Sequence, residues 1–218
     1  MILHIEHAIE PATLDVISDS LANETFVDGQ ETAGKAAKQV KQNRQLRLKG
    51  DKPAPLKMLL THLKANPVFK SATFAKDFVN IMVNQYQANM EYGLHIDDAL
   101  MGQTRTDISF TLGLSPIDSF QGGELVIEDT TGERSWKLGR GDLLIYPSHY
   151  LHKVNPVRQG QRLAMVGWIQ SHVRSPEQRE LLFDLKCSMS EEFEQRGKTS
   201  QYDRLSKSYN NLLRYWAD

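Results

Sequence analysis

The chain has 218 residues, and its 40% hydrophobic and 24% charged content is typical of one soluble globular domain with an appendage. Its 26 basic and 27 acidic residues give a net charge of −1, so charge provides no reason to expect nucleic acid or an anionic membrane as a partner. No apolar run approaches the roughly 20 residues of a membrane-spanning helix, no secretory leader is visible, and the single cysteine, Cys187, excludes an intramolecular disulfide. We therefore expect a cytoplasmic protein.

The first part of the chain is predicted to be helical. A first helix follows Pro11, which suits a helix start, and it carries an apolar stripe at helical spacing: Leu14, Ile17 and Leu21. The polar stretch 32–49 is rich in Lys, Gln and Arg, and it predicts a surface helix broken by Pro53 and Pro55. A further helix ends before Pro67 and carries a stripe of leucines: Leu56, Leu59, Leu60 and Leu63.

The middle of the chain changes to short strand patterns separated by turns. Residues 105–114 alternate strictly between large apolar residues and small or polar ones, which predicts a strand with one wet or functional face. Further strands are predicted at 72–86, 124–128, 135–138, 143–146, 151–154 and 162–171. Short strands at such spacing are typical of a sandwich or a jelly roll. The predicted fold class is therefore α+β, a jelly roll with supporting N-terminal helices.

After Ser175 the pattern returns to helix. Ser175 and Gln178 form a capping box around a proline at the first helical position, and Gly197 is a suitable stop. Apolar stripes mark this helix and a last one: Leu182, Leu185, Met189 and Phe193, then Tyr202, Leu205, Tyr209, Leu212 and Trp216. We expect residues 1–172 to form one domain and residues 173–218 a helical extension whose stripes suit internal packing or a homodimer.

A histidine and an aspartate two residues apart, His95 and Asp97, are the first candidates for chemistry. In a strand, residues two apart point to the same face, so both side chains would project together while Ile96 points to the opposite side. An imidazole and a carboxylate placed in this way can occupy two adjacent corners of one metal ion. The pattern is weak by itself, because the chain has 7 histidines and many aspartates.

His152 is the candidate third ligand. It follows a buried strand and a turn led by Pro147, from which it can reach across a jelly roll to His95 and Asp97. Two imidazoles and one carboxylate leave open positions for substrate and oxygen, as in non-haem iron(II) oxygenases, although a catalytic zinc would accept the same ligands. His149 is the rival ligand, but in an extended segment it points away from His152 and is expected at a turn or rim.

Arg162 opens an otherwise apolar strand and therefore needs a partner, because burying an unpaired guanidinium is costly. Its planar fork suits a carboxylate in bidentate geometry. Ten positions after His152, its expected partner is the distal carboxylate of 2-oxoglutarate, whose keto-acid end would chelate the metal. Arg162 thus changes the prediction from a metal site of unknown use to an oxygenase that consumes 2-oxoglutarate.

These residues, with the runs from Gly122 to Leu125 and from Gly141 to Val157, resemble the prolyl 4-hydroxylase-like iron(II)/2-oxoglutarate dioxygenases, and more closely the bacterial PKHD-type hydroxylases. The resemblance covers nearly the whole chain. It implies a double-stranded β-helix with flanking helices, and its site residues would be iron(II) ligands His95, Asp97 and His152 with Arg162 as the 2-oxoglutarate anchor. It also implies ascorbate dependence, and it places Tyr86 where related enzymes have a tyrosine that helps to bind 2-oxoglutarate.

The expected reaction uses O2 and 2-oxoglutarate to hydroxylate an unidentified substrate, peptidyl or small molecule, with release of succinate and CO2. Two alternatives stay open: a non-catalytic metal-dependent small-ligand binding protein on the same fold, and a hydrolytic or isomerase-type metalloenzyme that needs no oxygen. Arg162 argues against both, because neither needs a cation there. The polar loops 87–94 and 98–106 are expected to line the mouth, with Asp98 and Arg105 as candidate substrate contacts.

Overall fold

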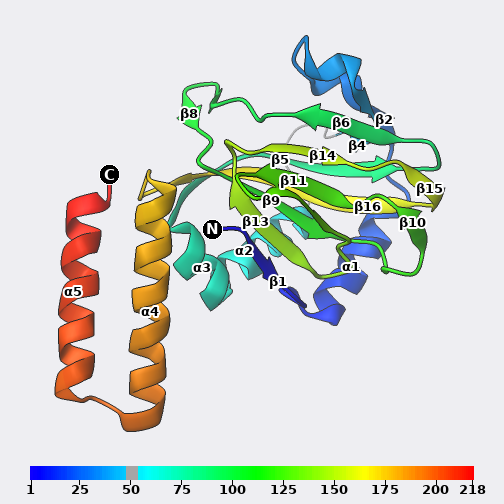
Figure 1. The fold of residues 1–218 in the computed structure, drawn as a ribbon. Helices are drawn as coiled ribbons and strands as arrows, with labels where there is room; N and C mark the ends of the chain where they lie inside the picture. The colour runs from blue at the N-terminus through cyan, green and yellow to red at the C-terminus, as the bar shows by residue number, and fades with distance from the viewer. Residues whose placement is uncertain (48–53) are drawn as a thin grey trace.

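Two antiparallel sheets face each other in the computed structural model, which describes residues 1–47 and 54–218 (Figure 1). The seven-stranded sheet has the order β1 (Leu3–Ile5), β13 (Leu143–Pro147), β9 (Ile108–Gly113), β16 (Arg162–Ser171), β5 (Ala75–Tyr86), β4 (Arg44–Leu46) and β2 (Phe26–Asp28). The five-stranded sheet has the order β12 (Gly132–Trp136), β11 (Leu125–Asp129), β14 (Leu151–Val154), β6 (Glu91–His95) and β3 (Lys41–Gln42). The fold is a double-stranded β-helix, so the predicted fold class is confirmed.

Two smaller ribbons complete the strands: β10 (Phe120–Gly122) with β15 (Val157–Gly160), and β7 (Leu100–Met101) with β8 (Thr104–Arg105). The predicted strand at 105–114 is β9, and all six of its residues are buried. The face that carries its small and polar residues is therefore not exposed to solvent, which favours a functional role for it. The predicted strand at 72–86 begins only at Ala75, because helix α3 (Pro67–Thr73) continues to Thr73 and Phe74 then takes a left-handed conformation with φ 45°.

Three helices cover the outer face of the seven-stranded sheet: α1 (Pro11–Leu21), α2 (Ala54–Ala65) and α3 (Figure 1). Leucines predicted from the helical stripes, among them Leu14, Leu59 and Leu63, join one buried cluster with Phe110 and Leu112 of β9. Full burial of each such side chain stabilises the fold by about 1.5–3 kcal/mol. This packing leaves the opposite face of the sheet for the space between the two sheets, where polar residues gather.

The surface helix predicted at 32–49 is wrong for the described residues; residues 48, 49 and Pro53 lie outside them. One short 3-10 helix, Gly29–Thr32, ends where the segment begins, and a second, Ala37–Gln39, lies within it, followed by β3 and β4. β3 pairs with β6 and β4 pairs with β5, so the chain crosses here from one sheet to the other. Lys41, Asn43 and Gln45 are buried and alternate with exposed neighbours, a two-residue period that the polar character of the inward residues conceals.

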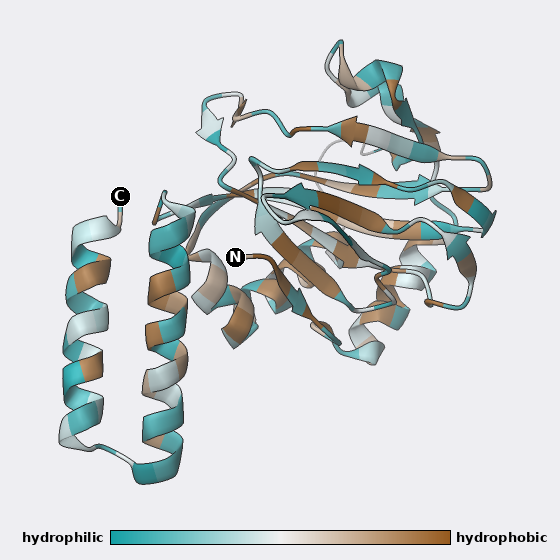
Figure 2. Cartoon of the chain, in the orientation of Figure 1, coloured by the Kyte–Doolittle hydropathy of each residue, from teal (hydrophilic) through white to brown (hydrophobic). Residues whose placement is uncertain are grey.

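The C-terminal extension is a helical hairpin that projects from the sheets, formed by α4 (Pro176–Arg196) and α5 (Ser200–Trp216) (Figures 1 and 2). The predicted cap is present, with the Ser175 hydroxyl accepting a hydrogen bond from the Gln178 amide at 3.2 Å, and Gly197 follows α4 with φ 69°. The apolar stripe of α5 is half-buried against α4, for example where the rings of Tyr202 and Phe193 lie 5.2 Å apart. Among the described residues, no helix is long and apolar enough to cross a membrane.

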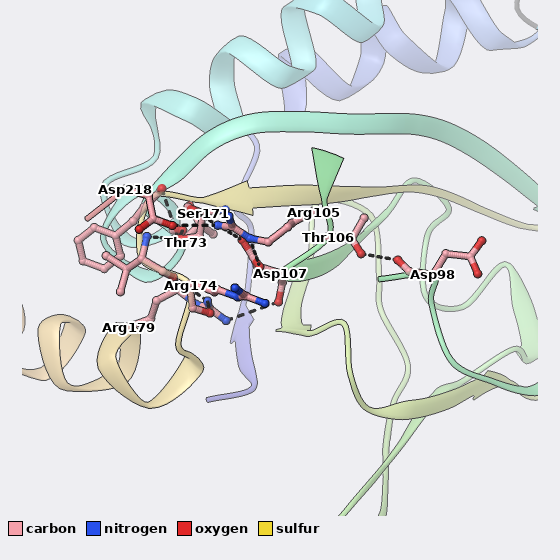
Figure 3. A network of polar contacts seen from close by, with 11 residues as sticks. Thr73, Asp98, Arg105, Thr106, Asp107, Ser171, Arg174, Arg179 and Asp218 are labelled. Carbon is pink, nitrogen blue, oxygen red and sulfur yellow. Dashed lines mark hydrogen bonds and ion pairs between the residues drawn. The ribbon is translucent and has the colours of Figure 1, made fainter. Parts of the chain in front are cut away.

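A polar network joins the extension to the sheets (Figure 3). The Asp107 carboxylate accepts hydrogen bonds from the Arg105 guanidinium at 3.2 and 3.3 Å and from the Ser171 amide at 2.9 Å. Arg105 also lies 3.5 Å from the Asp218 carboxylate, and the buried Arg179 donates to the carbonyl of Asp107 at 3.5 Å. Both ends of the helical hairpin are therefore linked to Asp107, directly before β9.

Replacing Asp107 by alanine is expected to lower the free energy of unfolding by about 2 kcal/mol, because it removes the acceptor of the Ser171 amide and the bidentate carboxylate partner of the partly buried Arg105. Urea denaturation of the wild type and the variant measures the change. The matched control is Asp77→Ala, which removes an exposed aspartate from β5. Equal losses in the two variants would show that the network does not hold the extension in place.

Candidate active site

The structure brings His95, Asp97 and His152 together between the sheets. His95 ends β6 and His152 lies on the neighbouring strand β14, where the two residues are direct partners in the antiparallel register. Their ring centroids are 4.2 Å apart, and the Nε2 atom of His152 lies 3.7 Å from the Asp97 carboxylate. One ligand atom from each of the three residues lies within 4.8 Å of the others.

Hydrogen bonds to the backbone prepare both histidines as metal ligands. The Nδ1 atom of His95 lies 2.9 Å from the Gly93 carbonyl, and that of His152 lies 3.1 Å from the Tyr150 carbonyl. A carbonyl can only accept, so each Nδ1 carries the proton and each Nε2 keeps its lone pair. Burial and, to a smaller extent, the neighbouring His152 ring lower the pKa of His95 to about 4, which keeps the imidazole neutral at pH 7.

Two serines that the sequence did not single out position Asp97. The strand β6 ends at His95, so strand periodicity alone does not orient the Asp97 side chain. Ser109 of β9 donates a hydrogen bond to the Asp97 carboxylate at 2.6 Å, and it accepts one from Ser148 at 2.8 Å. The alternation of residues 105–114 is the signal that could have found Ser109, because it places this serine on the functional face.

This donor set fits a divalent metal. Two neutral imidazoles and one carboxylate converge on one point, and bonds of about 2 Å to a shared ion are compatible with their spacing. Three protein ligands leave coordination positions open for a co-substrate and oxygen. The rival His149 is exposed and packs against Tyr150 with a ring distance of 4.6 Å, away from the trio.

Arg162 is a buried cation in the same cavity as the trio. Its side chain is 3% exposed, and its guanidinium lies 5.3 Å from the ring centroid of Tyr86, its register partner on β5. Among the described residues, no carboxylate lies within ion-pair distance of this guanidinium. Gly123, with φ 70°, leaves space for the Arg162 side chain, because a Cβ at this position would lie 2.8 Å from it. Burial lowers the pKa of Arg162 and raises that of Tyr86.

A cavity of about 110 Å³ lies between the sheets and opens to solvent. Its lining includes the metal trio, Arg162 and Tyr86, together with Asp98 from the loop after β6. Arg105, the other candidate for substrate contact, belongs instead to the network that holds the C-terminal extension (Figure 3).

Comparison with known proteins gives consistent family matches. Residues 81–170 match the model of the 2OG-Fe(II) oxygenase superfamily, and residues 177–218 match the C-terminal domain of PKHD-type hydroxylases. A PKHD-type hydroxylase from Idiomarina loihiensis is 52% identical over 218 residues, covering 100% of both chains. Another from Synechococcus elongatus is 44% identical over 223 residues, again covering 100% of both chains.

Two solved structures share the fold. A prolyl-4-hydroxylase from Pseudomonas putida has a TM-score of 0.60 at 17% identity, covering 78% of this chain and 92% of that one. The alpha-ketoglutarate-dependent epimerase SnoN of nogalamycin biosynthesis has a TM-score of 0.59 at 12% identity, covering 79% and 78%. Full-length identity to the relatives, rather than the shared fold, decides the assignment: this chain belongs to the PKHD-type hydroxylases and is an iron(II)- and 2-oxoglutarate-dependent dioxygenase.

Proposed function

We propose that His95, Asp97 and His152 hold the iron(II), and that Arg162 binds the distal carboxylate of 2-oxoglutarate with Tyr86 beside it. The observation that carries this proposal is the buried guanidinium of Arg162, which shares one cavity with the trio; Glu124 acts on it electrostatically, but no carboxylate among the described residues forms an ion pair with it. A bidentate carboxylate would offset the cost of burying this charge.

Each active-site residue has a separate role in the proposed reaction. When bound, the iron supplies the oxidation by O2 that hydroxylates a C–H bond of the substrate, with conversion of 2-oxoglutarate to succinate and CO2. Arg162 orients the co-substrate from the far end, and the ring of Tyr86 covers the guanidinium. Ser109 and Ser148 fix the direction of the Asp97 carboxylate. The two sheets exclude bulk water around these groups.

Anaerobic reconstitution tests the proposed function. Addition of 2-oxoglutarate to the iron(II)-loaded protein is expected to produce a charge-transfer absorption band, and admission of air is expected to yield succinate. A protein that only binds a small ligand would take up metal and give no succinate. Absence of both the band and succinate, with or without candidate substrates, would contradict the assignment of this cavity as the 2-oxoglutarate site.

Four further assignments belong to the same proposal. The domain division at residues 172 and 173 is supported by the end of β16 at Ser171 and the start of α4 at Pro176. The cytoplasm is the expected location, because the reaction consumes 2-oxoglutarate and needs reduced iron. Ascorbate would serve to keep that iron reduced.

A homodimer through the C-terminal hairpin is supported by apolar side chains that stay exposed there: Leu181, Phe193 and Tyr215.

A further inference from the structure

Lys41 is a second buried cation in the active-site cavity. Its side chain lines the cavity from β3 and is 3% exposed. Its ammonium nitrogen lies 5.2 Å from the ring centroid of Tyr92, and within the described part of the chain it has neither a hydrogen bond nor an ion pair. Burial lowers its pKa to about 8, so the amine is still mostly charged at pH 7. Asp28 and Asp97 act on the ammonium electrostatically and raise its pKa, but among the described residues no carboxylate forms an ion pair with it, which leaves its direct contacts open to an anionic ligand.

Two residues that line the same cavity from the opposite sheet carry buried polar atoms without a hydrogen-bond partner. The Asn84 side-chain oxygen on β5 and the Trp168 indole nitrogen on β16 have no hydrogen-bond partner among the described residues, and these side chains are 5% and 8% exposed. Buried polar atoms in native proteins are nearly always paired. Asn84 can accept a hydrogen bond and the Trp168 N–H can only donate one, so a ligand between them would carry a donor and an acceptor.

2-Oxoglutarate does not account for Lys41. Its two carboxylates are assigned to the metal and to Arg162, so a ligand anion in direct contact with Lys41 would be a third anionic group. Lys41 pairs with Tyr92 across β3 and β6, and the Tyr92 ring stacks on His95 at 3.6 Å. The ammonium therefore lies on the side of the cavity next to the metal trio, where the C–H bond to be oxidised must be placed.

We propose that Lys41, Asn84 and Trp168 form the subsite for the primary substrate, and that this substrate is a small carboxylic acid with an adjacent amide, such as an N-acyl amino acid. Lys41 binds the carboxylate, the amide N–H donates to Asn84, and the amide carbonyl accepts from Trp168. The depth of all three groups favours a free small molecule, although the carboxyl end of a peptide offers the same chemistry. The assignment rests on the proposed function of the cavity.

Calorimetry under argon tests the subsite with the protein loaded with iron(II) and 2-oxoglutarate. The probes are N-acetylglycine, N-acetylaspartate and N-acetyllysine, each compared with its neutral C-terminal amide. At least one acid is expected to bind at least about tenfold more tightly than its amide, and Lys41→Met is expected to remove this difference. Lys41→Arg retains part of it, and Trp168→Phe weakens the acid and its amide alike by loss of one donor. The matched control, Lys38→Met, removes an exposed lysine nearby and changes neither affinity.

Several results would overturn the inference. It is wrong if no acid binds, if acids and amides bind equally, or if Lys38→Met has the same effect as Lys41→Met. It is also wrong if Lys41→Met mainly raises the dissociation constant of 2-oxoglutarate, because the lysine then belongs to the co-substrate site. Tighter binding of an N-acetylated pentapeptide with a free carboxyl end would overturn the choice of a free small acid. Failure of the wild type to bind iron(II) or 2-oxoglutarate would instead contradict the proposed function.

Discussion

Replacement of Asp97 by alanine is expected to weaken iron(II) binding by more than about 100-fold, because it removes the only carboxylate of the His95, Asp97 and His152 trio. The loss of a charged ligand also leaves two neutral imidazoles, which together hold a divalent ion poorly. Competition with a chromogenic chelator under argon measures the affinity directly and does not depend on turnover. Succinate formation should disappear in parallel.

Two further variants make this test specific. Asp98→Ala removes the adjacent carboxylate, which is exposed and lies outside the trio, and iron affinity should stay at the wild-type value. Ser109→Ala removes the hydrogen bond at 2.6 Å that orients Asp97, and a loss of about tenfold is expected. Equal iron affinity in the wild type and Asp97→Ala would show that Asp97 is not a ligand.

Replacement of Arg162 by alanine is expected to raise the Michaelis constant for 2-oxoglutarate by about 100-fold, because a buried charge-assisted pair with the distal carboxylate is lost. Iron affinity should change little, since Arg162 is not part of the metal trio. Succinate formation at increasing 2-oxoglutarate measures the first effect, and chelator competition measures the second. A raised Michaelis constant with unchanged iron affinity identifies a residue that binds the co-substrate, whereas a residue that only supports the fold would change both.

Arg158→Ala is the matched control, because Arg158 is an exposed arginine on β15, four residues before Arg162. It should leave both constants unchanged. Arg162→Lys keeps the charge but not the planar fork, and an intermediate Michaelis constant is expected. An unchanged Michaelis constant in Arg162→Ala would contradict the anchor, and so would a loss of iron binding that matches Asp97→Ala.

Elements with strong local signals could be predicted from the sequence alone. The leucine stripes of α1 and α2, the capping box at Ser175 and the alternation of β9 each act through neighbours a few residues away. The metal trio could also be predicted, because few residue types bind metal and the turn before His152 limits where that histidine can reach. In these places local chemistry and the final fold agree.

The residues that complete the site depend on contacts distant in the sequence. Ser109 becomes a partner of Asp97, and Ser148 a partner of Ser109, only when β9, the turn after β13 and the loop after β6 meet. Lys41, in a segment predicted to be a surface helix, faces the cavity because β3 pairs with β6, about 50 residues further along the chain. Its neighbours inside the fold are polar, so no hydrophobic period revealed the strand.

The sequence by itself therefore determined the two-layer fold, the candidate iron ligands and the cation expected to bind 2-oxoglutarate. These depend on local periodicity and on residue types with narrow chemistry. Only the tertiary structure decided which hydrogen bonds orient the ligands and which further polar groups share the cavity. The neighbours of each cavity residue depend on which strands pair within each sheet and on how the two sheets face each other. A short stretch of sequence does not show which distant segments will pair.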